Sequence, residues 1–147
     1  MSTITRTITV NAPVERVFDH VMDIRKLWAM PDIAVTDVVT KPEGVGTTAR
    51  IWSHFLGFHI EGGLVYKEVT RPERILIEVS FLMEHPTWTF TFEPVAGGTA
   101  VTAQGEWHVR IPAVGGTFES MMAKEHEPFL DSMLAGLKAA VEQDVAA

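Results

Sequence analysis

Residues 3–22 decide the fold, and they read TITRTITVNAPVERVFDHVM. In the first half, Ile4, Ile8 and Val10 share one face and threonines occupy the other, which is the period of a half-buried strand. The run Asn-Ala-Pro at 11–13 is a typical helix start, because asparagine caps helices and proline is tolerated in the first turn. Apolar residues then recur at helical spacing, so we expect a strand followed directly by a helix.

Downstream, alternation with a period of two predicts six further strands. They lie at about residues 33–40, 45–55, 58–70, 75–83, 88–92 and 99–110, after a second short helical piece at 24–28. Residues 71–74 and 96–98 carry proline or glycine and indicate turns. Gly62-Gly63, inside a predicted strand, indicates a bulge or a sharp bend of the sheet.

A long helix is predicted to close the chain, because the apolar period changes from 2 to about 3.6 after Pro112. Its apolar stripe, which runs to roughly Glu142, consists of Phe118, Met121, Met122, Phe129, Met133, Leu137 and Val141. Pro128 lies inside this pattern, so we expect a kink near Lys124 or a helix in two parts. The order of elements predicts an α+β fold, in which a curved seven-stranded antiparallel sheet wraps around the C-terminal helix, with two short helices after the first strand.

The composition excludes several classes of protein. A length of 147 residues favours a single domain over residues 1–147. The absence of cysteine excludes disulfides, thiolate nucleophiles and Cys-ligated metal sites. A formal net charge of -7 argues against nucleic acid or an anionic membrane as a partner. The sequence also lacks the glycine loops of nucleotide-binding proteins and the nucleophile elbow of hydrolases.

The chain shows no sign of membrane insertion or export. No run approaches the roughly 18 consecutive apolar residues of a membrane span, and the N-terminus lacks the features of a signal peptide. We therefore expect a cytoplasmic protein with no stable membrane insertion, either a monomer or a homodimer.

Four local features carry a resemblance to a known superfamily. They are ITVNAPVERVF at 8–18, EGVGT at 43–47, RPERI at 71–75 and PVAGGT at 94–99. In this order, and with the closing helix, the chain resembles the SRPBCC superfamily (START-like, or birch-pollen-allergen-like) over about residues 3–143. Within that superfamily it looks most like the bacterial polyketide cyclase/dehydrase and lipid transport group.

The resemblance implies the helix-grip fold, with an elongated and largely apolar cavity between the curved sheet and the long helix. Members of the superfamily include lipid or sterol carriers, hormone binders, aromatase/cyclases and co-chaperone activators, so the fold does not assign the function. The superfamily has no shared catalytic motif. The resemblance therefore transfers no catalytic residue, and we expect no cofactor.

Aromatic and methionine side chains at core-facing positions are the candidates for lining such a cavity. Thioethers adapt to bulky apolar ligands, and the N–H of tryptophan seeks a partner. The same residues also suit an ordinary core. The predicted ligand-binding residues are Trp52, His54, Phe81, Trp88, Phe90, Trp107, Phe118, Met122 and Phe129.

The orientation of one strand decides the role of its polar residues. Arg50, Trp52 and His54 share a face, and they would form a corner for a carboxylate or an enolate if that face points inward. If Ala49 and Ile51 point inward instead, Arg50 is a surface charge. A register error of one residue reverses the assignment.

Other polar residues leave further alternatives open. The hydroxyl of Tyr66 is either a donor in the pocket or faces solvent. Glu106 and His108 share a strand face and are placed to hydrogen-bond to each other. On one uninterrupted strand, the odd spacing of His54 and His59 would put them on opposite faces. No histidine pair has the spacing of a zinc site, so no metal is expected.

Three functions remain in competition. The leading hypothesis is a binding protein that holds a small hydrophobic ligand (lipid, sterol or polyketide-like) between the sheet and the C-terminal helix. The alternative is a polyketide cyclase or dehydratase that moves protons with His54, Arg50, Tyr66 or Glu106. The third is a protein-interaction module, which requires an exposed apolar patch and no internal void.

Overall fold

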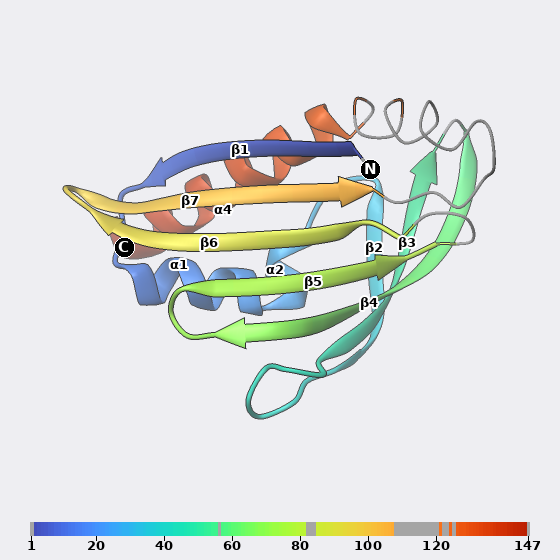
Figure 1. The fold of residues 1–147 in the computed structure, drawn as a ribbon, viewed down its shortest axis with the longest axis horizontal. Coiled ribbons are helices and arrows are strands. Elements are labelled where there is room, and N and C mark those ends of the chain that lie inside the picture. Colours follow the sequence, from blue (N-terminus) through green and yellow to red (C-terminus); the bar gives the residue numbers. More distant parts are fainter. Residues whose placement is uncertain are drawn as a thin grey trace.

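The computed structural model describes residues 2–55, 57–81, 85–107, 121, 124 and 126–146. Seven antiparallel strands form one sheet in the order β1-β7-β6-β5-β4-β3-β2, which curves around helix α4 (Figure 1). The strands are β1 (Ser2–Val10), β2 (Ile33–Val39), β3 (Thr48–Phe55), β4 (Phe58–Thr70), β5 (Arg74–Ser80), β6 (Thr87–Val95) and β7 (Gly98–Trp107). The helices are α1 (Val14–Met22), α2 (Ile24–Leu27) and α4 (Glu127–Ala146). The predicted α+β helix-grip fold is confirmed.

The junction between β1 and α1 differs in one detail from the expectation. Pro13 occupies the N-cap position of α1 with a φ of -60°, and no side chain caps this helix. Asn11 was expected to be the cap, and that expectation is wrong. The side-chain cap is on α2, where the carboxylate of Asp23 accepts hydrogen bonds from the N–H groups of Arg25 (3.1 Å) and Lys26 (3.3 Å).

Strand β3 begins later than the sequence pattern indicates. Val45 is exposed in the turn that precedes Thr48, between two glycines that both have a φ of 86°. Glycine adopts this left-handed conformation without steric cost. Gly44 and Gly46 therefore form a turn at the end of the β2–β3 connection, and β3 begins after that turn.

The expected bulge is also displaced. The ladder between β3 and β4 runs without a shift through Gly62 and Gly63, and the shift occurs between Tyr66 and Glu68, where β4 pairs with β5. At Gly62 a Cβ atom would lie 2.4 Å from the backbone carbonyl oxygen of Ser80 and 2.6 Å from the ring of Phe81. Glycine is needed at this position because the backbone of the neighbouring strand and this ring approach closely.

The core lies on the concave face of the sheet, under α1, α2 and α4. Side chains of alternate residues along each strand reach it, as the period of two requires. In β7, for example, Val101, Ala103 and Trp107 are all fully buried. In β3 the inward face consists of Ala49 and Ile51, so the strand orientation that the sequence left open is now fixed.

Helix α4 packs its apolar stripe on this concave face. Its buried residues are Leu130, Met133, Leu134, Leu137 and Val141. Helix α4 begins at Glu127, so Pro128 lies in its first turn, where a proline is tolerated. Met121 and Lys124 are also helical and a turn at His126 precedes α4, which agrees with the expected helix in two parts. The helix continues to Ala146, past the end near Glu142 that the pattern predicted.

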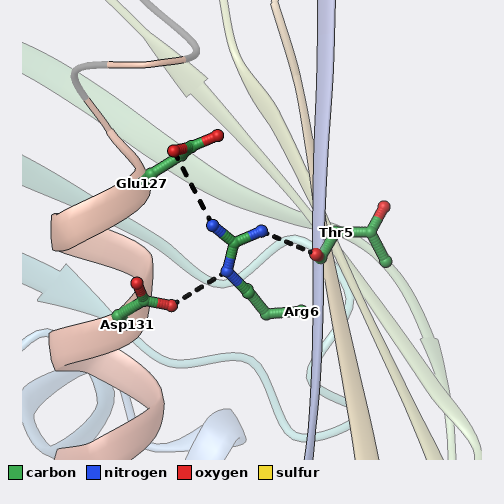
Figure 2. Close-up of polar contacts among 4 residues, drawn as sticks. All are labelled: Thr5, Arg6, Glu127 and Asp131. Atoms are coloured by element: carbon green, nitrogen blue, oxygen red, sulfur yellow. Dashed lines mark hydrogen bonds and ion pairs between the residues drawn. The ribbon is translucent and has the colours of Figure 1, made fainter.

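Polar contacts fix the start of α4 against β1 (Figure 2). The Nε of Arg6 donates to Asp131 at 3.0 Å, and a second guanidinium nitrogen lies 3.8 Å from Glu127. The third nitrogen donates to the carbonyl of Thr5 at 3.1 Å. Arg6 lies on the inward face of β1, together with Ile4 and the other apolar residues of that strand. At this position the strand therefore contacts α4 through charged groups and not through apolar packing.

Candidate functional site: a pocket between the sheet and α4

A cavity of about 70 Å³ lies between the concave face of the sheet and the start of α4. It is lined by Trp28, Ile33, Ile51, Ser53, His54, Ile60, Val79, Phe81, Pro86, Trp88, His126 and Phe129. These residues come from strands β2 to β6, from the connection between β5 and β6 (Phe81 and Pro86), from the C-cap of α2, and from the first turn of α4 and the residue before it. The pocket therefore forms only when the whole fold is assembled.

A cluster of aromatic rings builds the wall below α4. Trp88 contacts Trp107 in a T-shaped pair with ring centroids 5.3 Å apart, and it lies 5.9 Å from Phe129. The ring of Trp28 lies 6.2 Å from Phe129, and that of His126 lies 5.1 Å from Trp107. Such offset and edge-on pairs are favourable beyond the area that they bury. The cluster joins α2, α4, β6 and β7 at one place.

Glycine makes room for this wall. At Gly105, which faces inward on β7, a Cβ atom would lie 2.8 Å from the ring of Trp88 and 2.9 Å from that of Trp107. The ring of Trp88, from the neighbouring strand β6, and the ring of Trp107, from β7 itself, therefore both lie directly over the bare backbone of Gly105. They could not keep these positions over any larger residue.

The structure brings some of the predicted ligand-binding residues together and separates others. His54, Phe81, Trp88 and Phe129 line the pocket. Trp107 is fully buried behind Trp88. Their roles in ligand binding stay predictions.

The remaining predicted residues lie elsewhere. Phe90 is fully buried in the core between its register partners on β5 and β7. Trp52 lies on the outer face of β3, with its ring 4.9 Å from that of His59, and it is absent from the pocket lining. Phe118 and Met122 lie outside the described residues.

Three of the four candidates for acid–base chemistry do not line the pocket. The side chain of Arg50 is 55% exposed on the outer face of β3 and pairs with Glu61 and Asp37. Because Ala49 and Ile51 point inward, a binding corner of Arg50, Trp52 and His54 inside the pocket is ruled out. Glu106 alternates with the buried residues of β7 and accepts a hydrogen bond from Gln104 at 3.3 Å. The proposed contact of Glu106 with His108 lies outside the described residues.

Tyr66 is the third of these candidates, and it is a structural residue. Its side chain is fully buried, and its hydroxyl donates a hydrogen bond to the carbonyl of Val21 at 2.7 Å. Burial raises the pKa of Tyr66 well above its ordinary value, and the side chain of Trp28 opposes part of that shift in pKa. The hydroxyl therefore links α1 to β4, and it neither lines the pocket nor faces solvent.

The sequence pattern did not identify several pocket residues. Trp28 resembled the end of a short helix, and nothing local indicates that it reaches the sheet. Ser53 and Ile60 follow from the strand period once Ile51 is known to face inward, because both continue its face across the β3–β4 pairing. His126, in the turn before α4, was not among the predicted lining residues.

The part of the chain that the structure describes contains no cluster of three or more side chains placed to hold a metal ion. Likewise, none of its helices is both long and apolar enough to cross a lipid bilayer.

A curved sheet that grips a C-terminal helix over an apolar pocket defines the START-like class of helix-grip proteins. Within that class, the chain belongs to the polyketide cyclase/dehydrase and lipid transport family, whose model matches residues 1–142. No curated protein matches the chain.

Solved structures share the fold at low sequence identity. TTHA0849 from Thermus thermophilus is 22% identical, with 95% of this chain and 97% of that chain covered and a TM-score of 0.78. A START superfamily protein from Mycobacterium smegmatis is 18% identical, with 96% and 97% covered and a TM-score of 0.74. The di-domain ARO/CYC protein BexL is 21% identical, with 96% of this chain and 50% of that chain covered and a TM-score of 0.71. Identities this low establish the fold and leave the ligand open.

Proposed function

We propose that the chain binds a small hydrophobic ligand, of lipid, sterol or polyketide-like chemistry, in the pocket between the sheet and α4. The observation that carries the proposal is the composition of the lining, where nine of the twelve side chains are apolar and only Ser53, His54 and His126 can hydrogen-bond through oxygen or imidazole nitrogen. Trp28 is counted among the apolar residues for its ring, and its buried N–H has no hydrogen-bond partner among the residues that the structure describes. Ligand sites typically combine such apolar walls with a few polar groups that fix orientation.

The size of the cavity restricts how a ligand enters. The cavity of about 70 Å³ is smaller than the roughly 150 Å³ of an engineered cavity that binds benzene. A ligand of lipid or polyketide size therefore needs the walls to move apart or needs to extend beyond the cavity. The half-buried side chains of Phe81, Phe129 and His126 are less restrained by burial than the buried lining residues such as Trp28, Ile51 and Trp88.

Native mass spectrometry of gently purified protein, followed by extraction, tests the proposal directly. A co-purifying apolar molecule is the expected result, and its identity gives the ligand class. An apo mass, together with no binding from a panel of fatty acids, sterols and aromatic polyketides, would contradict the proposal.

A pocket-filling variant locates the site. Ile60→Trp places an indole at a half-buried position of the lining, so we expect a loss of at least about tenfold in affinity, or 1.4 kcal/mol. Val65→Trp is the matched control, because it makes a similar change on the opposite face of the same strand. Equal effects of both substitutions on ligand binding would place the site elsewhere.

A cyclase or aromatase activity is the second candidate, and one observation favours it. Ser53 on β3 and His126 before α4 come from opposite sides of the pocket, so a hydroxyl and an imidazole are available on two walls for moving protons at a bound polyketone. The discriminating measurement is turnover of a poly-β-keto substrate by the protein and by His126→Ala. Binding without turnover favours a carrier, whereas turnover that His126→Ala abolishes favours the enzyme. The internal cavity also argues against the interaction module, which was expected to have a filled interior.

A further inference from the structure

The hairpin formed by β3 and β4 places two histidines face to face. His54 on β3 and His59 on β4 are direct register partners, and their ring centroids are 5.0 Å apart with an interplanar angle of 62°. Opposite faces were expected only for one uninterrupted strand. The chain reverses between the two residues, as the two predicted strands at 45–55 and 58–70 allow, so both side chains lie on the same face.

The spacing of the two rings suits a shared metal ion. With a metal–nitrogen bond of about 2.0–2.1 Å, the metal lies about 3.2 Å from each imidazole centroid. If the two metal–nitrogen bonds make an angle of about 90–109° at the metal, the two ring centroids are about 4.5–5.2 Å apart. The observed separation of 5.0 Å falls in this range.

The surroundings of the pair favour a cation. Both histidines line a surface hollow of about 170 Å³ together with Asp32 and Trp52, and this lining contains no lysine or arginine. The carboxylate of Asp32 contributes negative charge to the hollow. The ring of Trp52 lies 4.9 Å from that of His59 and restricts its rotation, so less entropy is lost when a metal binds.

We propose that His54 and His59 form a divalent transition-metal site on the outer face of the hairpin, with water completing the coordination. Imidazole ligands suit copper, nickel and zinc, and Cu²⁺ binds most tightly of the three to such a set. The site goes beyond the proposed function, because His59 is absent from the lining of the main pocket.

The experiment titrates the tag-free full-length chain with Cu²⁺ and, separately, with Zn²⁺. Calorimetry gives the affinity of each metal, and the quenching of tryptophan fluorescence by Cu²⁺ gives a second measure of binding. Continuous-wave EPR of the Cu²⁺ complex shows whether imidazole nitrogen is bound. We expect one metal per chain, and we expect each of His54→Ala and His59→Ala to lower the association constant roughly tenfold or more. Because only neutral imidazole binds metal, acid is expected to release it.

His85→Ala is the matched control, because this histidine is also exposed and lies outside the hollow. It is expected to leave the affinity unchanged. Binding that survives both His54→Ala and His59→Ala, or that falls equally in His85→Ala, would overturn the proposal, as would the absence of binding to either metal. Since all three positions are exposed, circular dichroism is expected to show an unchanged fold. Ligand binding in the main pocket is expected to survive His59→Ala, so the two proposals can fail independently.

Discussion

Strand β4 contributes to the hydrophobic core at one end and to the lining of the pocket at the other. On β4, Leu64 and Tyr66 are buried, whereas Ile60, on the same face, is half-buried and lines the cavity. The difference follows from what covers the strand. At the core end Phe18 of α1 reaches the sheet and packs edge-on against Phe92 at 5.4 Å, and the hydroxyl of Tyr66 bonds to α1 as well.

The comparison teaches that the period of a strand determines which face points inward, but not whether that face becomes core or binding site. At the pocket end the cover consists of single side chains, chiefly Trp28 and Phe129, and not of a packed helix face. Single side chains do not fill the volume over this end of the strand, so a cavity remains. Substitutions at the core end are therefore expected to lower stability more than substitutions at the pocket end.

The largest loss of stability is expected for Phe18→Ala, at the core end. This side chain is fully buried, so its removal is expected to lower the free energy of unfolding by about 3–5 kcal/mol. Phe81→Ala at the pocket end removes a half-buried ring, for which about 1 kcal/mol is expected. Urea denaturation of both variants measures the difference. Equal losses would show that the pocket end is packed as tightly as the core end.

Tyr66→Phe tests the polar link between α1 and the sheet, with a smaller effect. The carbonyl of Val21 loses its partner, so about 1–3 kcal/mol of stability is expected to be lost. Burial raises the pKa of Tyr66 in the folded state, so the unfolded chain releases this proton first as the pH rises. The free energy of unfolding is therefore expected to fall above about pH 10, the ordinary value for tyrosine.

The pH dependence provides the control for this prediction. The variant lacks the titrating hydroxyl, so its alkaline loss of stability is expected to be smaller than that of the wild type. Parallel curves for the two proteins between neutral and alkaline pH would contradict the buried link that the structure shows.

The sequence predicted the fold well because its signals are local and repeated. The alternation in β1, the proline before α1 and the helical stripe of α4 each report on neighbouring residues, and together they define the order of elements. The pocket depends on contacts between distant elements. Trp28 is 60 residues from Trp88, and both lie in one lining only because α2 folds over the sheet. The inward face of β3 was ambiguous because a shift of one residue exchanges Trp52 with Ile51.

The smallest effect is expected at Arg6, which joins β1 to the start of α4 (Figure 2). Its side chain is 37% exposed, and its partners Glu127 and Asp131 are 42% and 58% exposed. Solvent and salt screen such pairs, so Arg6→Gln is expected to lower the free energy of unfolding by about 0–1 kcal/mol, and less at high salt. Leu134→Ala, on the buried face of the same helix, is expected to cost about 2–5 kcal/mol. If the apolar stripe holds α4 on the sheet, the loss of stability in Leu134→Ala stays much larger than the loss in Arg6→Gln at any ionic strength, as measured by urea denaturation. A loss at Arg6 that approaches the loss at Leu134 would mean that charge, and not packing, holds the helix over the pocket.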